Sequence, residues 1–547
     1  MCAGLATKNL SGYRILNLKR RVSHQSFSIC MEIIILAMLL SITGVPAALS
    51  MQDEPVLPYV IPKPKIEKFD TNHVCLSSKG EDIRVHVSET IDRQAKPIQD
   101  GLSLLSDRLD VLGATITTLR NTRGHDPVQL DKCSETELVE LLQNEGLKAD
   151  IDARRLAQAY FLRVHQSQKG NPFVTIQASS DLGIYYGLLT LCQLVTTDDT
   201  GRLVMPIATI ADWPEIGLRL AKTSASINKL SMLRRFSEWM KVFKINMIGL
   251  QYHGGNSKAP ETPFMTNIKS LCNDHRDGVL QTIVYFCPFR GGGKNIKGYD
   301  AQSFQKPGAY DLSQEADREK YAAFLTWIMA QGADGIEIDY NDWPGDPAGM
   351  EHVINLVHET LQDASPQAHI LFCPPFVPPE EGEGEITYYG DASPQMRALL
   401  SKLPKKIWPL WTGPGGIVIR KLEENTAEKW AMDAGRKPFF WLNRVALEVN
   451  KSFSRPLEEM PGVRVFHGEY LPKNLNKLFE GIHFNAGLGP GYNNLKDSIS
   501  TAALVYFASA ADYIWNPHAW DAVASTRRAT HFVDVMQPLL ARRREKE

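Results

Sequence analysis

The sequence lacks any marked imbalance of charge: its 60 basic and 62 acidic residues give a formal net charge of −2 over 547 residues. Proteins that bind nucleic acids or acidic membrane surfaces through electrostatic attraction usually carry a clear basic excess. The sequence also shows no internal repeat and no long low-complexity segment. We therefore expect a globular protein with no nucleic-acid partner.

The cysteines lack the spacing of a metal site. None of the eight forms a CxxC pair or a Cys/His cluster of the kind that binds zinc. Cys2 and Cys30 fall within the first 30 residues, which leaves six in the rest of the chain. We expect no metal site, and the pairing of the remaining cysteines stays open.

Residues 1–50 form an N-terminal extension that reads as a secretory signal. Basic residues at 19–21 precede Met31 and the apolar run Ile33–Ile42, and small residues follow, with cleavage expected near Ala47–Ser50. The run is short for a bilayer span. We expect a secreted or lumenal protein without stable membrane insertion after cleavage, with Met31 as an alternative start and an uncut signal anchor as the alternative outcome.

The length predicts at least two domains. Between about residues 55 and 215, short strand-like runs mix with helical patterns. Residues 82–88 alternate as a strand does, whereas 91–112 carry apolar residues at helical spacing. The run 171–180 indicates another strand, and a helix is expected to begin at Asp181. This part predicts a smaller α+β accessory domain.

From about residue 216 to 530, apolar strand-like runs alternate with helical stretches, which is typical of a parallel sheet or barrel. The expected strands are 217–221, 245–251, 281–288, 334–340, 369–374, 406–411, 438–443 and 481–485. The clearest expected helices are 230–243, 314–331, 350–363 and 426–435. Eight strands with crossover helices predict an α/β fold of the (β/α)8 TIM-barrel type. Residues 531–547 are expected to form a C-terminal tail, whose last residues, "ARRREKE", are read as a solvated helix end or a frayed tail.

The fourth expected strand ends in a cluster of polar residues, in the stretch "QGADGIEIDYNDWPGDP". Glu337 and Asp339 share one face of the strand because side chains alternate along it, whereas Asn341 and Asp342 lie just beyond it. Active sites of such barrels are built after the C-terminal ends of the strands. This cluster is therefore a candidate catalytic strand end.

Two interpretations of this cluster stay open at this point. A carboxylic acid beside aromatic residues such as Tyr340 and Trp343 can have its pKa raised by desolvation and then serve as a general acid. Alternatively, the acidic residues cap the following helix or pair with a basic neighbour.

Aromatic residues and amides recur near the ends of later strands. The set comprises Trp408, Trp411, Thr412, Trp441, Asn443, His483 and Asn485. Apolar ring faces flanked by amides suit sugars, which present C–H faces and hydroxyl edges. Each tryptophan taken alone is equally explained as filling the barrel or its helix layer.

The sequence resembles glycoside hydrolase family 84, the O-GlcNAcases and the β-N-acetylglucosaminidases called hyaluronidases. The stretch 410–443, from "LWTGPGG" to "FFWLN", is similar to the family's W-T-G-P strand end, its following helix and its W-D-N strand end. "ILFCPP" at 370–375 and "ASAADYIWNPHAW" at 508–520 resemble other family stretches, and 182–219 resembles the junction between accessory domain and barrel. The likeness covers about residues 55–530.

The resemblance implies substrate-assisted hydrolysis of β-linked N-acetylhexosamine with retention. In that family the substrate's 2-acetamido oxygen attacks the anomeric carbon, and two adjacent aspartates assist. The match places this pair on Asn341, which would orient the acetamide, and Asp342, the general acid and base. It implies substrate contacts by Asn443, Trp411, Asn485, Tyr340 and Asp339. No metal or organic cofactor is implied, and the partner is a glycan or glycoconjugate bearing N-acetylhexosamine.

Departures from the family pattern keep other functions open. Asn341 replaces an aspartate, "LAKTSAS" (220–226) stands where the family has G-F-Y-G, and W-D-N is changed to Trp441-Leu442-Asn443. The alternative is a barrel that binds glycans with impaired or no hydrolysis. A further interpretation compares "DGIEIDYND" with the D-G-x-D-x-D-x-E strand of family 18 chitinases, although Asn341 occupies the place of the catalytic glutamate.

Overall fold

The computed structural model describes most of the chain beyond residue 60, all within one compact unit that spans Pro58–Glu547. The described residues are 60–77, 82–119, 127–146, 151–167, 171–223, 230–252, 263–286, 314–339, 347–373, 394–411, 413, 422–442, 466, 468–485 and 501–546. The predicted signal segment therefore lies outside them. Among the described helices, none is long and apolar enough to cross a membrane.

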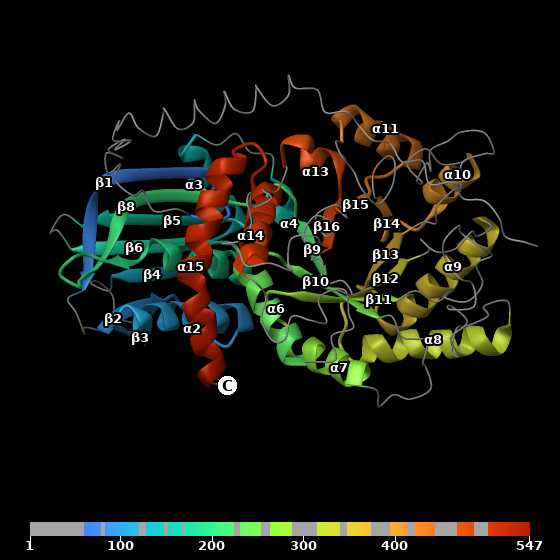
Figure 1. Ribbon diagram of the computed structural model, residues 1–547, viewed down its shortest axis with the longest axis horizontal. Helices are drawn as coiled ribbons and strands as arrows, with labels where there is room; N and C mark the ends of the chain where they lie inside the picture. The colour runs from blue at the N-terminus through green and yellow to red at the C-terminus, as the bar shows by residue number, and fades with distance from the viewer. Residues whose placement is uncertain are drawn as a thin grey trace, which may run out of the picture. The chain divides into compact units, whose positions relative to one another are not determined.

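The N-terminal part forms an eight-stranded mixed sheet (Figure 1). Its strands are β1 (Ile66–Ser77), β2 (Asp82–Val87), β3 (Thr115–Leu119), β4 (Val128–Lys132), β5 (Tyr160–Gln166), β6 (Pro172–Ala178), β7 (Thr196–Thr197) and β8 (Leu203–Asp212). The order is β1-β8-β5-β6-β4-β2-β3, and β7 pairs with β8. The strands from β6 through β4 and β2 to β3 pair in parallel, and the other pairs are antiparallel. This matches the expected α+β character.

Helices α2 (Lys96–Val111) and α5 (Asp181–Leu194) pack against each other beside this sheet. Nearly every residue of α5 is buried, which explains why its sequence is apolar on all sides. Gly187 lets α5 approach the sheet closely, because a Cβ at that position would overlap the Ile176 side chain. The short helices α3 (Glu135–Asn144) and α4 (Ala153–Leu156) contribute to a second, smaller apolar cluster that includes Phe161 and Trp213.

Eight parallel strands close into a barrel. They are β9 (Leu218–Thr223), β10 (Met247–Tyr252), β11 (Gln281–Phe286), β12 (Gly335–Asp339), β13 (His369–Cys373), β14 (Ile407–Trp411), β15 (Phe439–Leu442) and β16 (Gly481–Asn485). The last strand closes the barrel by pairing with the first, with Gly481 opposite Leu218 and Asn485 opposite Lys222. The predicted fold class is confirmed, and each barrel strand overlaps an expected one.

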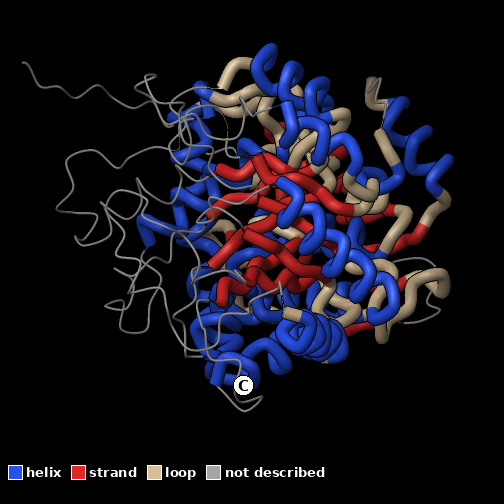
Figure 2. Tube along the Cα trace, turned by 90° about the vertical axis from the view of Figure 1, so that its right-hand side faces the viewer, coloured by secondary structure: helices blue, strands red, loops and turns tan. Residues whose placement is uncertain are grey.

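Helices surround the barrel strands, as the view in Figure 2 shows. They are α6 (Leu230–Val242), α7 (Pro263–His275), α8 (Glu315–Ala330), α9 (Pro347–Ala364), α10 (Pro394–Lys402), α11 (Glu424–Ala434), α13 (Leu475–Leu478) and α14 (Thr501–Trp515), with the 3-10 turn η4 (Gly468–Tyr470). Helix α11 ends at Gly435 in the left-handed conformation, with φ of 66°. Glycine adopts that conformation without the strain that a Cβ brings.

Residues 531–546, expected as a C-terminal tail, continue a long helix, α15 (Ala522–Lys546). Phe532, Met536 and Leu539 are buried along it. Near its end, Arg543 pairs with Asp107 at 3.2 Å and with Glu238 at 3.1 Å, so the basic cluster is partly anchored by carboxylates on α2 and α6. The apolar stripe of α15 is hard to recognise in the sequence because charged residues lie between its members.

A buried polar network joins the accessory sheet to the barrel. Asp212, at the end of β8, accepts hydrogen bonds from Tyr160 (2.9 Å), Lys244 (3.0 Å) and the indole of Trp515 (2.8 Å). Arg219 of β9 donates to Gln158 of the accessory part at 2.7 Å. Asp212, Lys244 and Arg219 therefore each have a partner across the boundary between sheet and barrel, as buried charges require.

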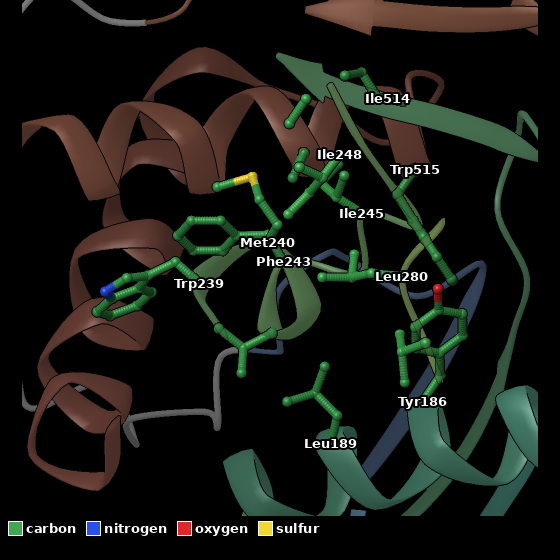
Figure 3. Close-up of a cluster of buried hydrophobic side chains, with 14 of the residues drawn as sticks. Tyr186, Leu189, Trp239, Met240, Phe243, Ile245, Ile248, Leu280, Ile514 and Trp515 are labelled. Atoms are coloured by element: carbon green, nitrogen blue, oxygen red, sulfur yellow. The ribbon is translucent and has the colours of Figure 1, made fainter. Parts of the chain in front are cut away.

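An apolar cluster lies at the same junction (Figure 3). It brings together Tyr186 and Leu189 of α5, Phe243 and Ile245 beyond α6, and Trp515 of α14. The rings of Tyr186 and Trp515 meet edge to face at 5.4 Å. Because these residues come from both parts of the chain, sheet and barrel share one continuous core. Cys192 and Cys272 lie buried as free thiols, and Cys75 and Cys133 are also free. Cys373 is buried as well, and no disulfide joins any two of these five cysteines.

We predict that acid weakens the fold through His275, which is buried with its ring nitrogens 2.8 Å from the Thr282 hydroxyl and 3.0 Å from the Ser237 hydroxyl. Burial, with a smaller contribution from Lys241, lowers the pKa of His275 to about 3. The unfolded chain binds this proton below its ordinary pKa of about 6.5, whereas the folded protein does not. Stability from this group is therefore complete above that pH and is lost as pH falls, by about 2 kcal/mol at pH 5.

Urea unfolding at pH 7 and pH 5 measures this loss. His275→Gln should reduce the difference between the two pH values by about 2 kcal/mol, since it removes the titrating ring. The matched control is His73→Gln on the exposed face of β1, which should leave the difference unchanged. An equal pH difference in wild type and His275→Gln would contradict the prediction.

Candidate active site

The lower part of the barrel interior is apolar. Every second side chain of a strand faces inward, and these inward-facing side chains form one cluster. Its members are Leu218, Leu220, Met247, Ile283, Leu371, Cys373, Leu410, Phe439 and Trp441. Gly481 fits into this cluster because a Cβ there would overlap the Phe439 ring. The barrel is therefore packed from Leu218 at its base up to Cys373 at the end of β13, and any site must lie at its C-terminal mouth.

Above the apolar base lies a buried ion pair between strands on different sides of the barrel. Lys222 of β9 donates to the Glu337 carboxylate of β12 with an Nζ to Oε1 distance of 3.0 Å. Their side chains are 1% and 0% exposed, so water does not screen this pair. The ammonium also lies 3.6 Å from the centroid of the Tyr285 ring and 4.1 Å from that of Trp441. Two cation–π contacts and one carboxylate thus hold a single lysine head group.

His483 of β16 completes this interior group. Its Nε2 lies 3.9 Å from Glu337 Oε2, and its ring lies 4.6 Å from the Trp441 ring between centroids. Burial, and to a lesser degree the charge of Lys222, holds the pKa of His483 well below its usual range. The imidazole is therefore neutral near pH 7, and the described charges of the interior are those of Lys222 and Glu337.

The strand register places this group near the mouth. Lys222 is opposite Asn485, the last residue of β16, and Glu337 is two residues before Asp339, the last residue of β12. In a (β/α)8 barrel these strand ends face the active-site side. The interior group consequently lies directly beneath the ends of strands on which the sequence placed candidate site residues.

The structure tests the predicted site only in part. Asp339 and Asn485 end β12 and β16 as expected, although their side chains lie outside the described part of the structure. Four further candidates, Tyr340, Asn341, Asp342 and Asn443, also lie outside the described residues. In the sequence they directly follow β12 and β15. Their roles therefore stay predictions.

Trp411 requires a correction. Its side chain lies on the outer side of β14, is 1% exposed, and stacks on Trp430 of α11 with ring centroids 5.5 Å apart. It also packs near Phe440 in the main core and not in the interior cluster of the barrel. Alternation along β14 is the cause, since Leu410 faces inward and its neighbour must face the helices. We therefore exclude Trp411 from the candidate sugar contacts.

Sequence analysis missed two members of the interior group, Lys222 and Tyr285. The signal was present for Lys222, because it follows Leu218 and Leu220 at the strand period of two. A lysine in that pattern is either at the mouth or paired inside the barrel. Tyr285 carries no comparable signal, since an aromatic residue is ordinary in a buried strand. Among the described residues, no group of three or more His, Cys, Asp or Glu side chains could hold a metal ion.

Comparison with known proteins supports this architecture. Residues 57–213 match the model of glycosyl hydrolase family 20, domain 2. No curated protein matches the sequence. Similar solved structures include CpGH84D, which is 17% identical with a TM-score of 0.57 over 87% of this chain and 72% of that chain.

Two family 20 enzymes are similar to the same extent. The chitobiase of Flavobacterium johnsoniae is 13% identical, with a TM-score of 0.56 over 88% of this chain and 73% of its own. The β-N-acetylhexosaminidase of Streptomyces coelicolor A3(2) is also 13% identical, with a TM-score of 0.56 over 88% and 96%. At these identities the likeness establishes the fold. It does not single out family 84, because structures of families 84 and 20 match about equally well.

We predict that Trp411→Ala destabilises the protein by about 3–5 kcal/mol, because it empties a buried ring site between β14 and α11. Urea unfolding measures the change. The control is Met432→Ala on α11, whose side chain is 80% exposed and whose loss should change stability by less than about 0.5 kcal/mol. A loss below about 1 kcal/mol for Trp411→Ala would indicate a ring that contacts solvent at the mouth.

Proposed function

We propose that this protein is a glycosidase that hydrolyses β-linked N-acetylhexosamine by the substrate-assisted retaining mechanism. The observation that carries the proposal is the closed barrel whose strand β12 continues, within three residues, into Asn341 and Asp342. The match of residues 57–213 to a family 20 domain supports it, as does the structural likeness to N-acetylhexosaminidases. We further propose that the protein acts on secreted or lumenal glycans, given its signal-like N-terminus.

In this proposal Asp342 protonates the leaving oxygen and then activates water, while the substrate's own acetamide oxygen forms the intermediate. Asn341 accepts a hydrogen bond from the acetamide N–H and fixes its direction. Asn443, Asn485, Tyr340 and Asp339 provide further substrate contacts. The closed, packed barrel beneath the mouth supplies the rigid base that such an arrangement requires.

The replacement of the aspartate by Asn341 lowers the rate expected for the reaction. An amide oxygen still accepts the acetamide hydrogen bond, but it adds no negative charge beside the positively charged intermediate. Loss of a charge-assisted bond costs about 1–3 kcal/mol, or roughly ten- to a hundredfold in rate. We therefore propose a slow enzyme.

Within the N-acetylhexosaminidases, two families remain candidates for the finer relationship. The "LWTGPGG" and "FFWLN" strand ends favour family 84, whereas the domain model that matches residues 57–213 is named for family 20. Substrate-assisted hydrolysis also occurs in family 20, so the proposed reaction holds for either relationship.

A second candidate function is binding of N-acetylhexosamine glycans without hydrolysis. The observation that favours it is again Asn341, together with the change of W-D-N to Trp441-Leu442-Asn443. Both candidates bind the sugar, but only the glycosidase hydrolyses it. A family 18 chitinase-like enzyme is the third candidate.

We predict that a chain of residues 51–547 releases 4-methylumbelliferone from its β-N-acetylglucosaminide, and that Asp342→Asn reduces this turnover. If Asp342 is the acid, the loss should be far larger for a disaccharide substrate, whose leaving group needs a proton, than for the activated phenol. The ratio of kcat/KM values for the two substrates measures this. Equal losses on both would rule out the acid role. Sugar binding without turnover by folded wild-type protein would support the binding-only candidate.

We also predict that Asn341→Asp raises kcat about ten- to a hundredfold, since it restores the charge-assisted bond to the acetamide. Steady-state kinetics on the same substrate measures the change. The control is Asn341→Ala, which removes the hydrogen bond and should lower kcat below that of the wild type. An unchanged or lower rate for Asn341→Asp would show that the amide is adapted to a different substrate.

A further inference from the structure

Residues 60–65 form a segment that belongs to no strand or helix but is largely buried at the junction between the accessory sheet and the barrel. Val60 is 0% exposed and Ile61 is 1% exposed. Irregular segments usually run over the surface, because their backbone N–H and C=O groups lack regular partners inside a protein. The burial of this segment, which we call the strap, therefore requires an explanation.

Three backbone N–H groups of the strap donate to side chains of other elements. The bonds run from Ile61 to Gln193 at 2.8 Å, from Lys63 to Asp512 at 2.5 Å and from Lys65 to Asp212 at 3.2 Å. None of the three acceptor residues is more than 7% exposed. The residues between these donors, Pro62 and Pro64, have no N–H. The sequence "IPKPK" therefore leaves no N–H between positions 61 and 65 without an acceptor.

Side-chain amides satisfy the carbonyl groups of the strap. Gln193 Nε2 donates to the carbonyl of Ile61 at 3.0 Å. Asn516 Nδ2 donates to the carbonyls of Lys63 and Pro64, at 3.1 Å each. In peptide recognition, hydrogen bonds to the main chain supply affinity, and pockets for side chains supply specificity. The strap is thus held in the way that a groove holds an extended peptide.

Two side chains of the strap also have defined sites. The side chain of Ile61 is part of the main apolar core. The ammonium of Lys65 lies 2.8 Å from Glu215 Oε2 and 3.3 Å from Asn516 Oδ1, and the Lys65 and Glu215 side chains are each 11% exposed. The groove therefore accepts an apolar residue at one end and a lysine at the other.

The groove does not need the strap to orient its acceptors. Its walls come from α5 and β8 of the accessory part and from α14 of the helix layer around the barrel. Arg528 of α15 pairs with Asp512 at 2.5 Å, and Lys244 pairs with Asp212 at 3.0 Å. Both carboxylates are thus oriented by cations that lie outside the strap. We expect such a groove to keep its shape when the strap leaves it.

We propose that this groove is a peptide-binding site that the protein fills with its own strap, and that it binds an extended peptide of the same sequence when the strap is displaced. The ligand class is an apolar residue followed by Pro-Lys-Pro-Lys. The docked strap fastens α14 to the accessory sheet and acts as a built-in ligand that stabilises the folded state while it is bound. This inference does not depend on the proposed glycosidase activity.

The test displaces the strap with Ile61→Asp, which places a carboxylate among apolar core side chains. The probe is a fluorescein-labelled peptide with the sequence of residues 58–65, and fluorescence anisotropy measures its binding. The peptide should bind the variant about tenfold or more tightly than the wild type, whose groove is filled. It should also raise the urea midpoint of the variant as its concentration increases. Equal affinities of the folded variant and the wild type would overturn the inference.

Two controls test whether the groove itself binds the peptide. Val523→Asp makes the same kind of change at a side chain that is 60% exposed, so this variant should bind the peptide no better than the wild type. Adding Gln193→Leu to Ile61→Asp removes both bonds to the first residue of the "IPKPK" stretch and should weaken binding about tenfold. Undiminished binding to this double variant would place the peptide elsewhere and overturn the inference.

A second measurement applies if the Ile61→Asp protein fails to fold. Hydrogen exchange of the wild-type protein, followed by mass spectrometry, compares the amides of the strap with those of β8. A strap that can leave its groove without unfolding of the sheet should exchange faster than β8 and far more slowly than the free peptide. Equal exchange of strap and β8 would show an inseparable part of the core, and an unprotected strap would show that it is not docked. Either result overturns the inference.

Discussion

Closure of the barrel by pairing of β16 with β9 is the constraint on which the rest of the structure depends. It brings the C-terminal ends of eight strands to one mouth, although the strands are spread over more than 260 positions of sequence. Closure also fixes which side chains face inward, since alternation then holds on every strand at once. Trp441 and Lys222 meet in the interior for this reason, while Trp411 and Arg219 point outward to the helix layer and to the accessory sheet.

The accessory sheet is attached to the barrel by a network in which each polar group has several partners. Asp212 receives three side-chain hydrogen bonds, and Lys244 lies near the rings of Tyr160 and Trp515 as well as its carboxylate. Removal of Asp212 would leave the buried Lys244 ammonium without its carboxylate. Together with the apolar cluster around α5, this makes the accessory sheet and the N-terminal side of the barrel one unit, so that the mouth is the part left for function.

Much of the fold was predictable from the sequence because parallel barrel strands are buried on both faces and read as short apolar runs. The strand at 281–286 and the strand at 369–373 are clear examples. Charged residues were misread where they have buried partners. Lys222 was passed over inside an apolar strand, and the basic end of α15 was expected to be solvated although Arg543 is paired with two carboxylates. Trp411 was misplaced because a motif match does not say which face of the strand a ring occupies.

The site was less predictable than the fold for a related reason. Family likeness can align Asn341 and Asp342 with a catalytic pair, but the protonation of an acid depends on charges that the motif does not contain. The two buried lysine pairs illustrate the difference. Lys244 lies among hydroxyl groups and a carboxylate that satisfy it through hydrogen bonds. Lys222, like Lys244, contacts aromatic rings, but the one described hydrogen-bond partner of its ammonium is the Glu337 carboxylate. Ring faces stabilise a cation without neutralising it, so within the described interior the counter-charge of Lys222 comes from Glu337, on the strand that leads to the proposed acid.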